Sequence, residues 1–193
     1  MPRWLKITAG FSVVAPLLTL VLWYVIAFLP YLGELKLISS RGSDSIKNIE
    51  NVFYPLAVAG ETTQGLRSYA VRQAYWSLVY EQNQGRTLVW HTNNILWRGA
   101  SFVHFNEHEI FGLWVECALS RCGSGLTTTA RKYFGKEISD LTERELASLV
   151  ALVKSPSRYA PGSEPGERRA NEILDRAKTH NLAFKRDALK RAP

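Results

Sequence analysis

The chain has 193 residues, of which 46% are hydrophobic and 21% are charged, proportions that are ordinary for a folded globular protein. This length allows one domain with a short appendage and leaves no room for two full domains. Lysine and arginine number 24 against 17 aspartates and glutamates, and the net charge of +7 favours anionic partners. No basic run or zinc-finger spacing occurs, so we expect lipid head groups and no nucleic acid.

The first element in chain order is a membrane segment. No charged residue lies between Lys6 and Glu34, and the stretch from Ile7 to Leu29 is predominantly apolar. About 20 such residues suffice to cross a bilayer as a helix. The sequence therefore predicts a tail and transmembrane anchor over residues 1–33 and a single domain over residues 34–193.

A cleavable signal peptide is the alternative, with Arg3 and Lys6 as its positively charged start. The apolar run is long for a signal peptide, and the residues after it offer no pair of small residues for cleavage, so we favour an uncleaved anchor. Basic residues flank both ends of the segment, and the positive-inside rule gives no clean orientation. The short basic tail favours the N-terminus inside and the domain outside.

After the anchor, residues 33–51 carry glycine, serine and mixed charges, and we expect a surface linker there. Apolar periodicity then predicts helices over Leu66–Tyr80, Thr87–Trp97 and Glu107–Leu119. No alternating strand pattern competes, so the expected fold is mainly α.

The C-terminal helices carry clearer boundary signals. A helix over Leu126–Phe134 is expected to end at Gly135, which can adopt a positive φ. Thr142 and Glu145 fit a capping box ahead of an apolar helix that Pro156 ends. A last helix is expected over residues 167–178.

Cys117 and Cys122 are too few for a disulfide framework. They are either two small core residues or, if the domain lies in an oxidising compartment, a pair that closes a short loop.

The segment from Gly123 to Arg176 holds several short motifs in order. They are Tyr133-Phe134-Gly135-Lys136; Leu141-Thr142 with Glu145, Ala147 and Leu149; Ser155-Pro156-Ser157-Arg158-Tyr159 with Pro161; and Arg169 with Asn171 and Leu174. This segment resembles the C-terminal half of the peptidoglycan glycosyltransferase domain, glycosyltransferase family 51, found in class A penicillin-binding proteins and monofunctional transglycosylases. Upstream, residues 107–125 resemble a further family segment loosely, with the family's asparagine falling on Glu116.

The resemblance implies a small lysozyme-like helical domain at the cell inner membrane, single-pass, with the domain on the periplasmic or extracytoplasmic side. The implied partners are lipid-linked peptidoglycan precursor or glycan strand, inner membrane lipid and other envelope proteins. The family joins sugars by attack of a 4-hydroxyl on an anomeric carbon with loss of lipid pyrophosphate, which suits two carboxylates. No cofactor is expected, although the resemblance allows a divalent metal.

Glu61 is the candidate for the first carboxylate, because it follows an apolar stretch as the family's glutamate does. An isolated solvated glutamate at a helix start is the alternative. No Asp or Glu occurs from Gln82 to Asn106, where the second should fall, and the donor-binding loop is at best Gly85-Arg86-Thr87-Leu88. The candidate residues for binding the substrate's pyrophosphate are Arg131, Lys132, Lys136 and Arg158. The alternative is that these four residues form a solvated basic face.

Other polar and aromatic residues admit two interpretations. His91, His104 and His108 suit a metal only if a third ligand joins them, and ordinary polar histidines are the alternative. The tryptophans, which include Trp76, Trp90, Trp97 and Trp114, form either a sugar-facing or lipid-facing surface or part of the core.

Three hypotheses follow from the sequence. The first is a divergent glycosyltransferase that uses Glu61 and whose catalytic motifs are eroded. The second is a non-catalytic envelope scaffold or glycan-binding module on the same fold. The third is a lysozyme-like hydrolase, because one acid suffices for some glycan cleavage.

Overall fold

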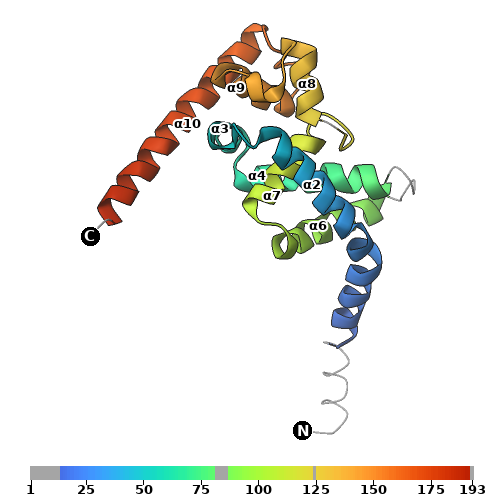
Figure 1. Ribbon diagram of the computed structural model, residues 1–193. Coiled ribbons are helices and arrows are strands. Elements are labelled where there is room, and N and C mark those ends of the chain that lie inside the picture. The colour runs from blue at the N-terminus through green and yellow to red at the C-terminus, as the bar shows by residue number, and fades with distance from the viewer. Residues whose placement is uncertain (1–13, 81–86, 124, 192–193) are drawn as a thin grey trace, which may run out of the picture.

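The computed structural model describes residues 14–80, 87–123 and 125–191, and within these ranges every regular element is a helix (Figure 1). The prediction of a mainly α fold is therefore confirmed. The elements are η1 (Tyr24–Phe28), η2 (Leu29–Tyr31), α2 (Leu32–Ile46), α3 (Glu50–Glu61), α4 (Thr63–Tyr75), η3 (Trp76–Tyr80), α6 (Thr87–His104), α7 (Glu107–Cys117), α8 (Gly125–Phe134), η4 (Ile138–Asp140), α9 (Glu143–Lys154) and α10 (Glu164–Arg191).

The N-terminal helix is continuous from Val14 to Ile46, and its apolar part is long enough to cross a membrane. Only 6% of its most apolar window is buried against the rest of the chain. Pro30 lacks a backbone N–H and is accommodated where the helix passes through the π turn η1 and the tighter 3₁₀ turn η2. The basic residues Arg3 and Lys6, which precede the apolar run, lie outside the described residues.

The expectation of a surface linker after the anchor is wrong, because α2 occupies most of that segment. Gly42 and Ser39 within it serve close packing: a Cβ on Gly42 would lie 1.9 Å from the carbonyl oxygen of Gly112 on α7. Nearby, the Ser39 hydroxyl donates to the carbonyl oxygen of Glu109 at 2.6 Å. Small polar side chains in α2 thus let two helix backbones approach.

Helix α3 runs through Pro55, and its buried face carries aromatic packing into the centre of the domain. The Phe53 ring lies 5.3 Å from that of Phe111 and 6.0 Å from that of Trp114, both on α7. Proline within an apolar stretch hides such a helix from periodicity, since proline usually interrupts a helix interior.

The remaining helices follow the sequence closely. The expected helix over residues 66–80 appears as α4 followed by η3. Helices α6, α7 and α8 begin within a residue of expectation, but α6 continues past the expected end at residue 97 to His104, and α7 ends at Cys117, before the expected residue 119. Gly135 ends α8 with φ +65°. The capping box of Thr142 and Glu145 starts α9, and α10 begins earlier and ends later than expected.

The loop after α7 is closed by a disulfide between Cys117 and Cys122, whose Cα atoms lie 3.8 Å apart. Of the two sequence interpretations, the structure has the paired one.

Candidate functional site

Glu61, the expected catalytic carboxylate, is the last residue of α3 and lies at the junction with α4. Thr62 adopts φ 65°, which breaks the helix between them, and its hydroxyl oxygen accepts a hydrogen bond from the Gly65 N–H at 3.1 Å. A side-chain cap of this kind satisfies an N–H that the first turn of a helix otherwise leaves unpaired. The chain reversal places the Glu61 carboxylate beside the first turn of α4.

Two contacts hold the end of α3 in place. A Cβ on Gly60 would lie 2.4 Å from Cγ1 of Val150, so α3 packs closely on α9 at this point. From α10, Nη2 of Arg169 donates to the Gly60 carbonyl oxygen at 3.1 Å. Arg169 thus satisfies a carbonyl at the helix end and fixes the residue that precedes Glu61.

Glu61 lines a pocket of about 250 Å³ between α3, α4 and α9. The Glu61 side chain is only 10% exposed, and its Oε2 lies 3.8 Å from Nζ of Lys154, the last residue of α9. Arg72 from α4 also lines the pocket, and its guanidinium lies 5.3 Å from the centre of the Tyr69 ring. The described residues that line it are Glu61, Gly65, Ser68, Tyr69, Arg72, Val153 and Lys154.

The lining therefore combines one carboxylate with two cations, two hydroxyl groups and little apolar surface. Guanidinium and ammonium groups suit phosphate oxygens, and a carboxylate suits proton transfer from a hydroxyl. Sequence reasoning missed Arg72 and Lys154. The position of Lys154 directly before the Ser155-Pro156 motif was an available signal, whereas nothing in the sequence marks Arg72.

The structure places the four expected pyrophosphate-binding residues elsewhere, and none of them lines the Glu61 pocket. Arg131 donates to both carboxylate oxygens of Glu137, at 2.7 and 2.8 Å, and these hydrogen bonds lower the pKa of Glu137. Lys136 bonds Oε1 of Glu145 at 2.7 Å. Lys132 and Arg158 lie near the rings of the tyrosines that follow them in the chain.

A comparison with protein families matches the transglycosylase model to residues 58–178, which includes Glu61, Arg72, Lys154 and Arg169. The chain belongs to the transglycosylase family. The resemblance drawn from the C-terminal motifs is thereby confirmed, and the match extends upstream of them to the end of α3.

Among curated proteins, the transglycosylase chain is 39% identical over 73 residues to penicillin-binding protein 1A of Pseudomonas aeruginosa, covering 36% of this chain and 9% of that protein. It is 34% identical over 62 residues to penicillin-binding protein 1A of Streptococcus oralis, covering 31% of this chain and 10% of that protein. The chain thus spans about a tenth of the length of these relatives. No solved structure matches.

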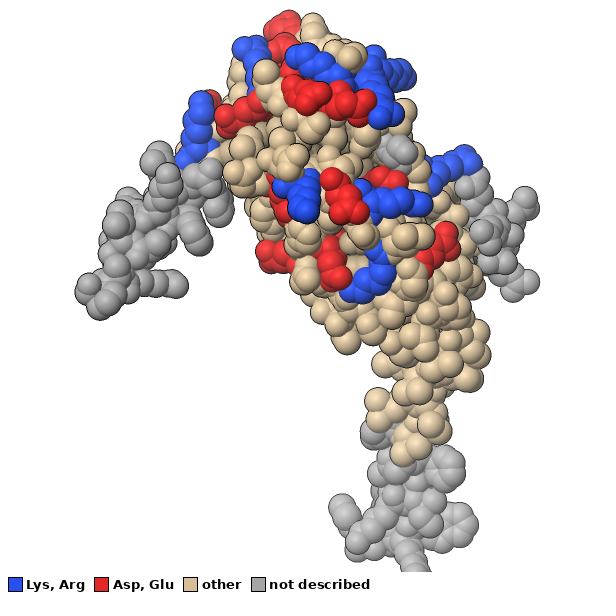
Figure 2. Space-filling view, viewed as in Figure 1, with Lys and Arg blue, Asp and Glu red and all other residues tan. Residues whose placement is uncertain are grey.

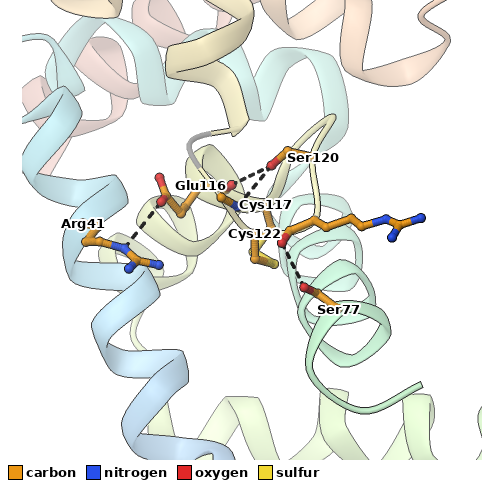
Figure 3. Close-up of a disulfide and its surroundings, with 8 residues drawn as sticks. Arg41, Ser77, Glu116, Cys117, Ser120 and Cys122 are labelled. Atoms are coloured by element: carbon orange, nitrogen blue, oxygen red, sulfur yellow. Dashed lines mark hydrogen bonds and ion pairs between the residues drawn. A yellow bond between two sulfur atoms is a disulfide. The ribbon is translucent and has the colours of Figure 1, made fainter. Parts of the chain in front are cut away.

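Glu116, the position on which the sequence resemblance places the family's asparagine, is buried near the end of α7 (Figure 3). Its Oε1 lies 3.5 Å from Nε of Arg41 on α2. In the loop that the disulfide closes, the Arg121 carbonyl oxygen accepts a hydrogen bond from the Ser77 hydroxyl on η3 at 2.9 Å. Glu116 and the disulfide loop thus connect α7 to both α2 and η3.

Among the residues that the structure describes, no second carboxylate lines the Glu61 pocket. Divalent metals such as Mg²⁺ and Ca²⁺ prefer several oxygen ligands, usually with more than one carboxylate. One carboxylate facing the ammonium of Lys154 does not fit such an ion, and we derive no step through a metal. Residues Gly85 and Arg86 of the expected donor-binding loop lie outside the described residues, and Thr87 begins α6.

The histidines make separate contacts. His104 is hydrogen-bonded to the Tyr24 hydroxyl at 2.8 Å, and His108 bonds the Glu50 carboxylate. Of the tryptophans, Trp97 and Trp114 are fully buried, whereas Trp76 is 39% exposed and its ring centre lies 6.4 Å from that of Trp90.

Proposed function

We propose that this chain is a membrane-anchored transglycosylase-family module that binds lipid-linked peptidoglycan precursor at the Glu61 pocket and polymerises it poorly. The observation that supports this most directly is the pocket itself, in which Glu61 is the single acid among the described lining residues and lies with Lys154 and Arg72. The two cations suit the precursor's pyrophosphate, and Glu61 suits a sugar hydroxyl as a hydrogen-bond acceptor.

The chemistry of polymerisation explains how this pocket could bind the precursor and yet polymerise it slowly. The acceptor's 4-hydroxyl must lose a proton while its oxygen bonds the anomeric carbon, and the bond from that carbon to the pyrophosphate oxygen must break. Glu61 can accept the proton, and the two cations can stabilise the departing pyrophosphate. Loss of a catalytic acid or base typically lowers the rate by about 100-fold to 10,000-fold, so the absent second carboxylate argues for weak turnover.

We place the domain outside the cytoplasm, held by the N-terminal helix in the cell inner membrane. The apolar helix from Val14 to Ile46 supports the anchor. The disulfide between Cys117 and Cys122 supports the compartment, because disulfides persist in oxidising environments and are rare in the cytosol. The boundary near residue 33 between anchor and domain stays a prediction, since one helix runs through it.

Binding of a fluorescent lipid-linked precursor to the full chain in nanodiscs tests this proposal. We expect Lys154→Ala and Arg72→Ala each to weaken binding about tenfold, since a charge-assisted hydrogen bond contributes about 1.5 to 3 kcal/mol. Glu61→Gln should leave most of the binding intact. Arg131→Ala and Arg158→Ala form the comparison set, because these residues lie outside the pocket.

The same preparations, scored for products, separate the three hypotheses. Polymer formed by the natural chain at family rates and lost in Glu61→Gln would make it a working glycosyltransferase. Digestion of preformed glycan would make it a hydrolase. Absence of precursor binding, or binding that depends on Arg131 and Arg158 instead of Lys154 and Arg72, would contradict the proposed site.

A further inference from the structure

Two further pockets, separate from the Glu61 pocket, share helix α3. The first has a volume of about 610 Å³ at the start of the helix, and the second has a volume of about 690 Å³ between the end of α3 and α10. Sites for small ligands usually measure about 300 to 1,000 Å³. The first is lined by Lys47, Asn48, Glu50, Asn51, Tyr54 and Pro55. The lining of the second includes Val58, Ala59 and Thr62 on one side and Asp175, Arg176 and Thr179 on the other.

The two pockets lie along one side of α3. Asn51, Pro55 and Thr62 follow one another at i, i+4 and i+11, a spacing that places residues on one side of a helix. Pro55 of the first pocket and Ala59 of the second are one turn apart, and the run from Asn51 to Thr62 is about 16 Å long at the helical rise. The opposite side of the helix is buried through Phe53. We call the residues that line the two pockets the α3 groove.

Contacts behind the α3 groove hold its walls in place. The Tyr54 hydroxyl donates to Oε2 of Glu107 at 2.9 Å, and the Tyr54 ring meets that of Phe111 edge-on, with ring centres 5.2 Å apart. At the other end, the bond from Arg169 to the Gly60 carbonyl oxygen holds α10 against α3. A site whose walls are already fixed loses little conformational freedom when a ligand binds.

The groove presents polar groups that are available to a ligand. Among the described residues, the exposed side chains of Asn48, Asn51 and Arg176 make no hydrogen bond or ion pair with one another or with the rest of the domain. Each asparagine amide offers two donor hydrogens and a carbonyl acceptor. These groups can bond a ligand without first breaking a contact within the domain.

The groove differs from the Glu61 pocket in its balance of charge. Lys47 is matched by Glu50 in the first pocket, and Arg176 by Asp175 in the second, so the lining carries no net charge although the whole chain carries +7. Figure 2 shows the same interspersion of basic and acidic side chains over the visible face of the domain. A balanced lining does not favour a phosphate or another anion.

A neutral ligand with many hydroxyl groups and apolar ring faces fits this lining. The fixed ring of Tyr54 offers a flat apolar surface for a sugar ring, and the methyl groups of Val58 and Thr62 extend that surface along the helix. An acetamido group carries one N–H and one carbonyl oxygen, and the amides of Asn48 and Asn51 carry the complementary acceptor and donor. The amides therefore favour N-acetylated sugars over plain glucose units.

We propose that the α3 groove binds a strand of N-acetylated amino sugars, separately from the Glu61 pocket. The sugar rings lie over Tyr54 and along the outer side of α3, and the asparagine amides bond their acetamido groups. The domain is thereby held on polymerised glycan while the Glu61 pocket stays open to a lipid-linked molecule. The inference does not depend on precursor binding at the Glu61 pocket.

Binding of fluorescent chitotetraose, an oligomer of N-acetylglucosamine, to the full chain in nanodiscs tests this inference. We expect Asn51→Ala to weaken binding about threefold to tenfold, because it removes a hydrogen bond between neutral groups. Tyr54→Ala should weaken binding about tenfold through loss of the stacking surface, and Tyr54→Phe, which keeps the ring, should retain most of it. Tyr133→Ala is the matched control, since Tyr133 is 39% exposed on α8, outside the groove.

Asn51 is exposed and unpaired among the described residues, so Asn51→Ala tests the inference even where Tyr54→Ala fails to fold. Absence of chitotetraose binding, or binding that Asn51→Ala leaves unchanged, would overturn the inference. Equal affinity for cellotetraose, which has no acetamido groups, would overturn the assigned chemistry. Loss of binding in Lys154→Ala with none in Asn51→Ala would place the sugar in the Glu61 pocket instead.

The fluorescent lipid-linked precursor, measured on the same preparations, keeps this inference apart from the proposed function. Chitotetraose binding without precursor binding would contradict the proposed function alone. Precursor binding without chitotetraose binding would contradict the glycan site alone.

Discussion

At the residue scale, Glu145 satisfies two partners at the start of α9. Its Oε2 accepts from the Thr142 backbone N–H at 2.8 Å, and its Oε1 bonds Nζ of Lys136 at 2.7 Å. The hydrogen bond from Lys136, followed by that from the Thr142 backbone, lowers the pKa of Glu145. Ionised Glu145 is therefore favoured by the folded state over the unfolded chain.

The sign of this preference gives a pH prediction. A carboxyl whose folded pKa is lowered stabilises the fold above its unfolded pKa of about 4.3, and the contribution is lost as the pH falls through the folded value. Glu145→Gln keeps a hydrogen-bonding side chain but removes the charge. We expect it to lower the free energy of unfolding by about 1 kcal/mol at pH 7 and to have little effect at about pH 2.

The measurement is denaturant unfolding of the full chain in detergent micelles at both pH values. Glu143→Gln is the control, since it removes the same charge from the same helical turn. An equal loss of stability at both pH values would show that the carboxylate's charge plays no part.

Residue-level reasoning from the sequence identified one lining residue of the proposed pocket and not the two cations. Glu61 could be placed because it ends an apolar stretch, which the structure shows as α3. Arg72 and Lys154 could not be brought to it, because their proximity depends on the packing of α3 and α4 against α9. The sequence alone did not show that Arg131 and Lys136 are already paired. In the structure Arg131 forms an ion pair with Glu137, and Lys136 forms one with Glu145.

At the scale of elements, α2 and α7 cross where two glycines meet. A Cβ on Gly112 would lie 2.3 Å from the Ser39 carbonyl oxygen, and one on Gly42 would meet the backbone of Gly112. Apart from the Ser43 hydroxyl, which lies 2.2 Å from the Gly112 Cβ position, the neighbours are backbone atoms, which cannot rotate away as a side chain can. The crossing therefore has no space for a methyl group.

Gly42→Ala should consequently weaken the fold. Forcing extra volume into a packed contact typically costs about 1 to 3 kcal/mol. Gly33→Ala, in the same helix, meets nothing within 4 Å and should be neutral or stabilising by up to about 1 kcal/mol, because alanine favours helix. Thermal unfolding in micelles compares the two, and equal midpoints would contradict the close crossing.

The elements that could be predicted are those with local signals. The capping box of Thr142 and Glu145 predicts the start of α9, and Gly135, which adopts a positive φ, predicts the end of α8. The segment of α2 was predicted to be a linker because its glycines and serines are typical of a loop. In the structure Gly42 and Ser39 instead contact α7, about 70 residues away in the chain. Helix α3 was hidden by Pro55.

At the scale of the whole molecule, the disulfide bears on both stability and compartment. It joins two cysteines that are five residues apart in the chain and so closes the loop between α7 and α8. In the chain-entropy account, closing so short a loop stabilises by about 2 kcal/mol. Cys122→Ser should therefore lower the free energy of unfolding by that order, as should reduction of the natural chain.

Thiol labelling in intact cells provides the second measurement. If the domain lies outside the cytoplasm, a mass-tagged maleimide should leave the denatured natural chain unmodified until a reductant is added. The Cys122→Ser chain should accept one tag without reductant. Two tags on the natural chain without reductant would place the domain in a reducing compartment.

The unbroken helix from Val14 to Ile46 has a mechanical consequence. No loop separates its apolar part from α2, and α2 is clamped on α7 through the glycine crossing. With that helix in a bilayer, the π and 3₁₀ turns at Pro30 are the place where it can bend, and the height and azimuth of the Glu61 pocket otherwise follow the tilt and rotation of the helix. A lipid-linked molecule would then reach the pocket by lateral diffusion to it, rather than by the pocket sweeping toward the lipid.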